Sequence, residues 1–175
     1  MTQCVLVIDI QQDYFPGGAH PLVGTEAAAV VARSVVDDAR ARGERVLHMQ
    51  HLAADPDATF FVVGTPGAEI HPLLAPVAGE QVIVKHAPNS FLGTGLAAIL
   101  AEHDVDALTV VGMMSSMCVD ATTRAALDLG LDVTVIENGC AAPDLVFQGT
   151  TVPGRTVHAA FMAALGGAGA TVQSR

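Results

Sequence analysis

The chain has 175 residues and a formal net charge of −10 at pH 7, with 18 acidic against 8 basic side chains. A surface of this sign repels phosphate backbones, which argues against nucleic acid as a partner. No apolar run reaches the roughly 18 residues of a membrane-spanning helix, so we expect no membrane partner.

The length suits one domain, which we expect over residues 1–175. The first residues lead straight into CVLVIDI without a basic segment or a small-residue cleavage site, so a cytoplasmic location is expected. The three cysteines, Cys4, Cys118 and Cys140, form no CxxC pair. This odd number argues against a disulfide framework or a structural zinc site, and it leaves a single functional thiol open.

Short apolar runs alternate with helical patterns along the chain. In chain order, the expected elements are a strand at 4–10, a helix at 25–42, strands at 45–50 and 81–85, a helix at 95–104, a strand at 107–112, a helix at 117–130, a strand at 132–137, a helix at 154–167 and a strand at 170–173. The Pro- and Gly-rich stretch 51–80 is interpreted as a long ordered loop with a short helix. Six strands alternating with helices predict an α/β fold, a three-layer α/β/α, doubly wound, Rossmann-like sheet of mostly parallel strands.

Three chemically complementary side chains are expected at one edge of this sheet. In open parallel sheets, ligands bind beyond the carboxyl ends of the strands. Asp9 lies near the end of the first strand, Lys85 ends the third, and Cys118 follows the fourth where a helix begins. A carboxylate, an ammonium and a thiol together are typical of a nucleophilic site.

Each of these residues also has an ordinary structural interpretation. Cys118 could be a buried core cysteine, although a helix N-terminus favours a thiolate and lowers a cysteine pKa. Lys85 is the only lysine in the chain, which is either chance composition or a requirement for an ammonium. Asp9 could simply cap a turn.

Other residues near the same edge carry weaker signals. Loop aromatic residues could line an apolar pocket or contact a second copy of the chain, and the two interpretations have equal weight; these residues are Tyr14, Phe15, Phe60, Phe61 and Phe91. His48 and His51 have no third ligand at a metal-binding spacing and are interpreted as core or surface residues. No phosphate-binding motif is present, so we expect no nucleotide cofactor.

Three segments in order resemble the isochorismatase-like cysteine hydrolases, a superfamily that includes nicotinamidases and N-carbamoylsarcosine amidase. The segments are VLVIDIQQDYF (5–15), VIVKHAPNSFLGTGL (82–96) and VVGMMSSMCVDATTRAALDLGLDVTVIENGCAA (110–142). The resemblance implies Asp9 as general base, Lys85 as its charged partner and Cys118 as nucleophile. It also implies a cis peptide between Met113 and Met114, an oxyanion hole made by the amides of Met114 and Cys118, and Met113 in the substrate pocket.

The resemblance implies an amidase that cleaves a C–N bond of a small carboxamide through a thioester. The stretch MQHLAADPDATFF (49–61) lacks the Asp-x-His metal pattern of nicotinamidases, so we predict no metal and disfavour nicotinamide. Two alternatives stay open, a vinyl-ether hydrolase that does not need the thiol and a non-catalytic ligand-binding or redox-sensing protein. Family members commonly pair or form tetramers, which implies a homodimer or a higher homo-oligomer.

Overall fold

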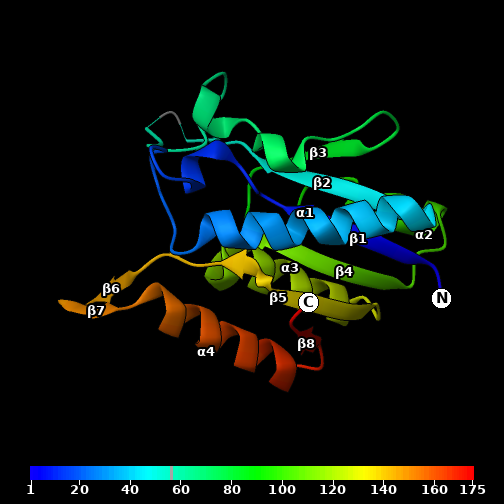
Figure 1. Ribbon diagram of the computed structural model, residues 1–175. Helices are drawn as coiled ribbons and strands as arrows, with labels where there is room; N and C mark the ends of the chain where they lie inside the picture. Colours follow the sequence, from blue (N-terminus) through cyan, green and yellow to red (C-terminus); the bar gives the residue numbers. More distant parts are fainter. Residues whose placement is uncertain (56) are drawn as a thin grey trace.

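The computed structural model describes residues 1–55 and 57–175, so Pro56, in the loop predicted over 51–80, lies outside the described residues. Six parallel strands form one sheet in the order β3-β2-β1-β4-β5-β8 (Figure 1). The strands are β1 (Gln3–Ile8), β2 (Arg45–His51), β3 (Gln81–Lys85), β4 (Ala107–Met113), β5 (Asp132–Ala141) and β8 (Thr171–Gln173). The predicted fold class is confirmed.

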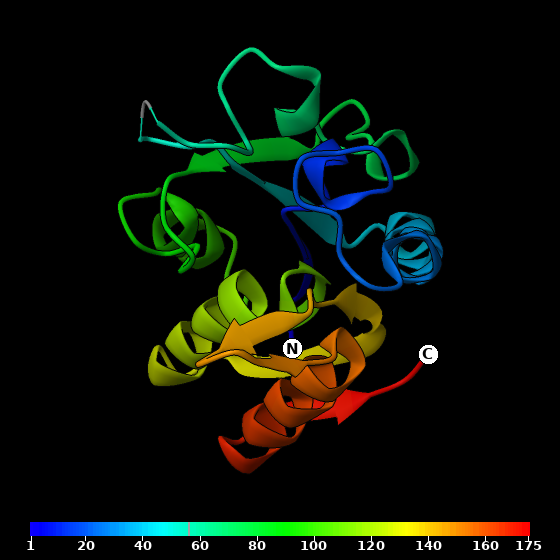
Figure 2. The same cartoon turned by 90° about the vertical axis from the view of Figure 1, so that its left-hand side faces the viewer.

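Helices cover both faces of the sheet. The helices are α1 (Thr25–Arg42), α2 (Leu96–Glu102), α3 (Asp120–Asp128) and α4 (Gly154–Gly167). Helix α1 packs in one hydrophobic cluster, and the other three helices contribute to a second cluster across the sheet. Figure 2 shows α1 and α2 on opposite sides. The central strands β1 and β4 are buried nearly throughout because helices cover both of their faces. In the part of the chain that the structure describes, no helix is long and apolar enough to cross a membrane.

Three details differ from the predicted elements. The loop 51–80 holds two short 3₁₀ turns, Pro66–Ala68 and Pro72–Leu74, in place of the expected short helix. An antiparallel hairpin of β6 (Leu145–Phe147) and β7 (Thr150–Val152) was not predicted, and it projects beyond α4 in Figure 1. The helix expected at 117–130 begins as a π-helix, Ser115–Val119, which continues into α3.

The strand order reverses beside β1, since the chain passes from β1 through β2 to β3 and then returns to β4 on the other side of β1. Ligand sites of open parallel sheets lie at such a switch point, beyond the carboxyl ends of the strands. In Figure 2 this edge of the sheet faces the viewer. The register of β2 and β3 places His51 beside Lys85 here. The topology therefore brings the ends of β1, β2, β3 and β4 to one place.

Gly112 of β4 lies opposite Ile8 of β1, where there is no space for a side chain. Its φ is +141°, and a Cβ at this position would lie 2.1 Å from the carbonyl oxygen of Ile8. We expect Gly112→Ala to lower the free energy of unfolding by about 3 kcal/mol, because both backbone strain and overpacking oppose the added methyl. Chemical denaturation measures this loss. Gly167→Ala is the control, since a Cβ at Gly167 meets no atom within 4 Å and its φ is not positive; equal stabilities of the two variants would contradict the prediction.

Candidate active site

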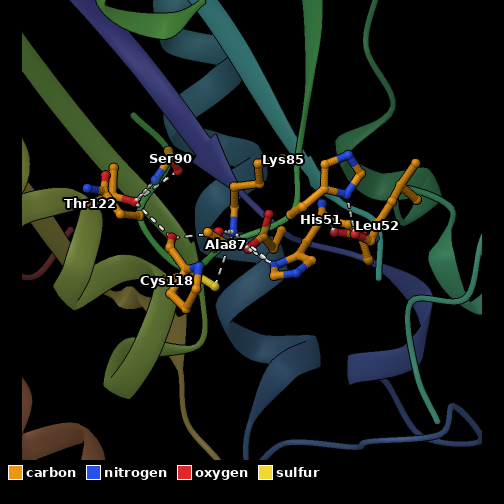
Figure 3. Close-up of polar contacts among 12 residues, drawn as sticks. His51, Leu52, Lys85, Ala87, Ser90, Cys118 and Thr122 are labelled. Carbon is orange, nitrogen blue, oxygen red and sulfur yellow. Dashed lines mark hydrogen bonds and ion pairs between the residues drawn. The ribbon is translucent and has the colours of Figure 1, made fainter. Parts of the chain in front are cut away.

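Asp9, Lys85 and Cys118 meet at the predicted edge of the sheet. The Lys85 ammonium nitrogen lies 2.7 Å from Asp9 Oδ2 and 3.3 Å from the Cys118 sulfur. All three side chains are buried, with Asp9 fully enclosed and Cys118 2% exposed. Figure 3 shows Lys85 between Cys118 and His51. Residues from three distant segments thus form one contiguous acid, cation and thiol cluster.

Asp9 directly follows β1 in an unusual backbone conformation, with a φ of +48°. A non-glycine residue in this left-handed region is typical of functional sites. Its amide donates to Met49 O at 3.2 Å, which fixes it against the end of β2. Burial raises the pKa of the Asp9 carboxyl, while the Lys85 charge and hydrogen bond oppose this rise. Oδ1 has no hydrogen-bond partner among the described residues, so one buried carboxylate oxygen stays available to a proton donor.

The Lys85 ammonium is surrounded by acceptors. Besides Asp9 it lies 2.9 Å from Ala87 O, 3.1 Å from His51 Nδ1 and 3.4 Å from Pro88 O. Thr122, one turn after Cys118 on α3, accepts from Ser90 N at 3.0 Å. This bond fixes the segment that carries the two carbonyl groups. Enclosure of this kind holds the only lysine of the chain as a fixed charge.

The surroundings of Cys118 raise the pKa of its thiol, contrary to the expectation that the helix terminus lowers it. Burial raises the pKa of the Cys118 thiol, and the neighbouring Asp9 charge raises it further, while Lys85 opposes both. A charge is costly in a low-dielectric interior. Burial and the Asp9 charge therefore both favour the protonated form of the thiol. The other two thiols are also buried, and burial raises the pKa of both Cys4 and Cys140 to about 12.

The peptide bond between Met113 and Met114 is cis, at the position that the resemblance implies. Met113 ends β4, and Met114 immediately precedes the π-helix that carries Cys118. Both methionines pack in the hydrophobic cluster on the α1 side of the sheet, where Met113 is fully buried. Cys118 is the fourth residue of this π-helix, so it belongs to the first turn of the whole helical segment.

His51 joins the site although the sequence pattern was interpreted as a core or surface histidine. Its Nδ1 lies 3.1 Å from Lys85 Nζ and 4.0 Å from Asp9 Oδ2. An ammonium can only donate, so Nδ1 is the acceptor and the ring proton resides on Nε2. Burial lowers the pKa of His51 to about 4, and the Lys85 charge acts in the same direction. The imidazole is thus neutral at physiological pH.

The backbone of His51 is held by Gln11, a fully buried side chain. The Gln11 amide donates to His51 O at 2.9 Å, and its oxygen accepts from His51 N at 2.8 Å. The rule that selects Lys85, the end position of a parallel strand, selects Gln50 when the strand is expected at 45–50. In the structure the strand extends by one residue to His51, so the sequence pattern does not indicate His51 as a site residue.

The predicted pocket aromatics separate into two groups. Tyr14, Phe60 and Phe61 cluster beside the site, with Phe61 4.6 Å from Tyr14 and 5.7 Å from His51 between ring centroids. Burial raises the pKa of the Tyr14 hydroxyl. These three aromatic rings pack against one another, next to His51.

Phe15 and Phe91 make other contacts. Phe15 stacks on His71 with centroids 3.8 Å apart. Phe91 lines a cavity of about 200 Å³ with residues of α2 and the end of α3, among them Leu100 and Leu129. The pocket roles of Phe15 and Phe91 stay predictions.

The ligand atoms of Asp9, His51 and Cys118 lie within 4.8 Å of one another, a spacing that could hold a metal ion. The Lys85 ammonium, however, contacts all three side chains at 2.7–3.3 Å. A cation at their centre would therefore meet an existing positive charge, and the described residues do not fit a metal with Lys85 in its observed position. Fixed positive charge in this site comes from the lysine.

Comparison with known proteins agrees with this architecture. The model of the isochorismatase domain family matches residues 3–174. The chain is 47% identical over 174 residues to YddQ of Bacillus subtilis, an uncharacterised isochorismatase family protein, covering 99% of this chain and 97% of YddQ. It is 31% identical to maleamate amidohydrolase of Pseudomonas putida, covering 75% of this chain and 68% of that protein.

A crystal structure of an isochorismatase-type hydrolase from Oleispira antarctica superimposes with a TM-score of 0.94 and 46% identity, covering 99% of this chain and 93% of that chain. The family match, the sequence identity and the fold all agree. The chain is a hydrolase of the isochorismatase family.

Proposed function

We propose that this hydrolase is an amidase that cleaves the C–N bond of a small carboxamide through a thioester on Cys118. The observation that carries the proposal is the contact of the Cys118 sulfur with a buried Lys85–Asp9 ion pair. A neutral thiol beside a carboxylate with a free oxygen is suited to proton transfer at the moment of attack. One relative, maleamate amidohydrolase, has a name that specifies hydrolysis of an amide.

In the first half-reaction, Asp9 takes the thiol proton while the sulfur attacks the amide carbonyl. Lys85 stabilises the negative charge of both groups at 2.7 and 3.3 Å. The amides of Met114 and Cys118 hold the oxyanion, as expected for backbone N–H groups in the first turn of a helix. Asp9 then returns the proton to the leaving nitrogen, which releases ammonia or an amine and leaves the acyl group on sulfur.

In the second half-reaction, Asp9 takes a proton from water, and the resulting hydroxide attacks the thioester carbonyl. The C–S bond breaks, the carboxylic acid leaves, and the proton returns to the sulfur. The buried carboxylate suits this role because its burial raises the pKa of Asp9 and strengthens it as a base. One carboxylate thus acts as base and acid in turn.

His51 orients the acyl group in this proposal. Its Nδ1 accepts from Lys85, so the neutral ring offers Nε2–H as a donor beside the aromatic rings of Tyr14 and Phe61. Small-molecule sites commonly combine an apolar lining with a few fixed polar groups. A compact acyl group with an additional acceptor, such as a second carbonyl or a carboxylate, fits this environment.

We expect His51→Ala to lower kcat/KM about 10- to 100-fold, the effect of losing one or two hydrogen bonds to charged or buried groups. Steady-state kinetics measures the change. His103→Ala is the matched control, because His103 ends α2 and lines a surface cavity with Thr2 and Gln3 at the start of β1, at the opposite edge of the sheet. A decrease in kcat/KM of less than threefold for His51→Ala would contradict the proposed role of His51.

The proposal is tested by ammonia release from a panel of small carboxamides, including maleamate, nicotinamide and simple aliphatic amides. At least one member is expected to yield ammonia and acid in equal amounts. An isochorismate-type vinyl ether is included because its cleavage requires an acid but no thiol. The proposal fails if no amide releases ammonia, or if only the vinyl ether is cleaved and Cys118→Ala retains that activity.

A further inference from the structure

A second polar cluster anchors the first residue of the π-helix that carries Cys118. We call it the Ser115 network, consisting of Ser115, His158 and Glu137. Ser115 Oγ lies 2.8 Å from His158 Nδ1 and donates to Ala141 O at 3.1 Å. His158 Nε2 lies 3.3 Å from Glu137 Oε2. The network links the first residue of the π-helix to α4 and to β5.

The two ring nitrogens of His158 join two parts of the fold. Nδ1 contacts the Ser115 hydroxyl, and Nε2 contacts the Glu137 carboxylate on β5. Glu137 also accepts from the Ser174 hydroxyl, so its carboxylate is itself held in place. The imidazole is therefore fixed at both ends and links Ser115 to β5.

We infer that His158 is a positioning residue which fixes the nucleophile turn through Ser115. This inference rests on the proposed function, since it assigns His158 a role in the reaction of Cys118. Ser115 is fully buried and precedes Cys118 by three residues. It is therefore held from two sides, by Ala141 of β5 and by His158 of α4.

This anchoring bears on the chemistry because the turn supplies the sulfur and the proposed oxyanion donors. The main chain of β4 is already paired with β5 at Met113 and Ala141, so Ser115 extends that attachment past the end of the strand. A nucleophile displaced by about 1 Å loses on the order of 100-fold in rate. His158 does not touch the reacting atoms in this arrangement and acts through Ser115.

The surroundings of His158 contain few other charges. It lines a cavity of about 190 Å³ between α1, β5 and α4. Among the residues that line the cavity, the other titratable side chains are Arg155 on the same helix and Cys140 on β5. Glu137 is the acidic group at hydrogen-bond distance. The contacts with Ser115 and Glu137 are therefore the polar contacts that fix the ring.

The kinetic test compares His158→Gln with Arg155→Gln, an exposed position on the same helix. His158→Gln is expected to lower kcat about 10- to 100-fold while KM changes less than about twofold, because a glutamine amide cannot bridge Ser115 and Glu137 together. Ser115→Ala is expected to give a similar loss. The double variant should lose no more than the worse single variant, since both act through one contact. Two single variants with kcat within twofold of Arg155→Gln would overturn the inference.

The amide assay of the parent chain and the kinetics of the variants separate failure of the proposed function from failure of this inference. If the parent chain hydrolyses no amide, the reaction is wrong and the positioning role is overturned with it. If amide turnover is present and both variants of the network retain kcat, the amidase proposal stands and the role of His158 is refuted. Melting temperatures of all variants exclude unfolding as the cause of a loss.

Discussion

The Cys118→Ala variant is expected to lose at least about 10⁴-fold in kcat for amide hydrolysis, because the covalent route disappears with the sulfur. The fold should survive, since the change removes one small buried atom that contacts Lys85 and costs about 1 kcal/mol of stability. Ammonia release and thermal unfolding measure the two effects. A vinyl-ether hydrolase predicts the opposite result, activity without the thiol.

Cys4→Ala is the matched control for this change. Cys4 is a fully buried cysteine on β1, part of the same hydrophobic cluster as Cys118, but it lies toward the opposite end of the strand from Asp9. Its replacement should leave kcat within about twofold. Retention of a tenth or more of the parent activity by Cys118→Ala would show that the sulfur is not the nucleophile. Cys118→Ser should lose at least about 100-fold, because a hydroxyl ionises far less readily than a thiol.

The Asp9→Asn variant is expected to lose about 10³-fold in kcat/KM, within the range for removal of a general acid–base group. An asparagine preserves the shape but cannot accept the thiol proton. It also leaves the buried Lys85 ammonium without its counter-charge, and breaking a buried pair in this way costs about 3–5 kcal/mol of stability. We therefore expect Asp9→Asn to lower both kcat/KM, measured by steady-state kinetics, and the free energy of unfolding, measured by chemical denaturation.

The pH profile of kcat/KM tests the role of Asp9 as the general base. A general base acts when it is ionised, so activity should fall as the pH drops through the pKa of Asp9. Burial raises that pKa above its ordinary value of 3.8, so the acid limb of kcat/KM should lie above the range of an exposed aspartate. The limb should be absent from the residual activity of Asp9→Asn. An unchanged acid limb in that variant would assign the titration to another group and remove Asp9 as the base.

Much of the fold follows from local patterns. The helix Thr25–Arg42 and the strand Gln81–Lys85 have the predicted bounds, because Gly43 stops the helix in a left-handed conformation and an apolar run defines the strand. Asp9, Lys85 and Cys118 were found because parallel strands align their carboxyl ends. Each element is defined by a short stretch of sequence, whereas the meeting of the three side chains also requires the parallel arrangement of the strands.

The missed features depend on tertiary structure or on weak local signals. The β6–β7 hairpin turns at Gln148 and Gly149, both with positive φ, and glutamine is an unusual residue for the first of these positions. The π-helix before α3 begins at Ser115, whose partners lie on β5 and α4. The high pKa of Cys118 comes from burial by distant segments, which a helix-terminus argument omits.

The central claim is that the acyl group passes through a covalent bond to Cys118, and hydroxylamine partitioning tests it most directly. An amide that the enzyme turns over is incubated with increasing hydroxylamine, and ammonia, free acid and hydroxamate are measured together. A thioester predicts that hydroxamate replaces acid while the two still sum to the ammonia released, and that Cys118→Ala yields neither. Steady ammonia release with acid as the sole acyl product at every hydroxylamine concentration would contradict the covalent mechanism.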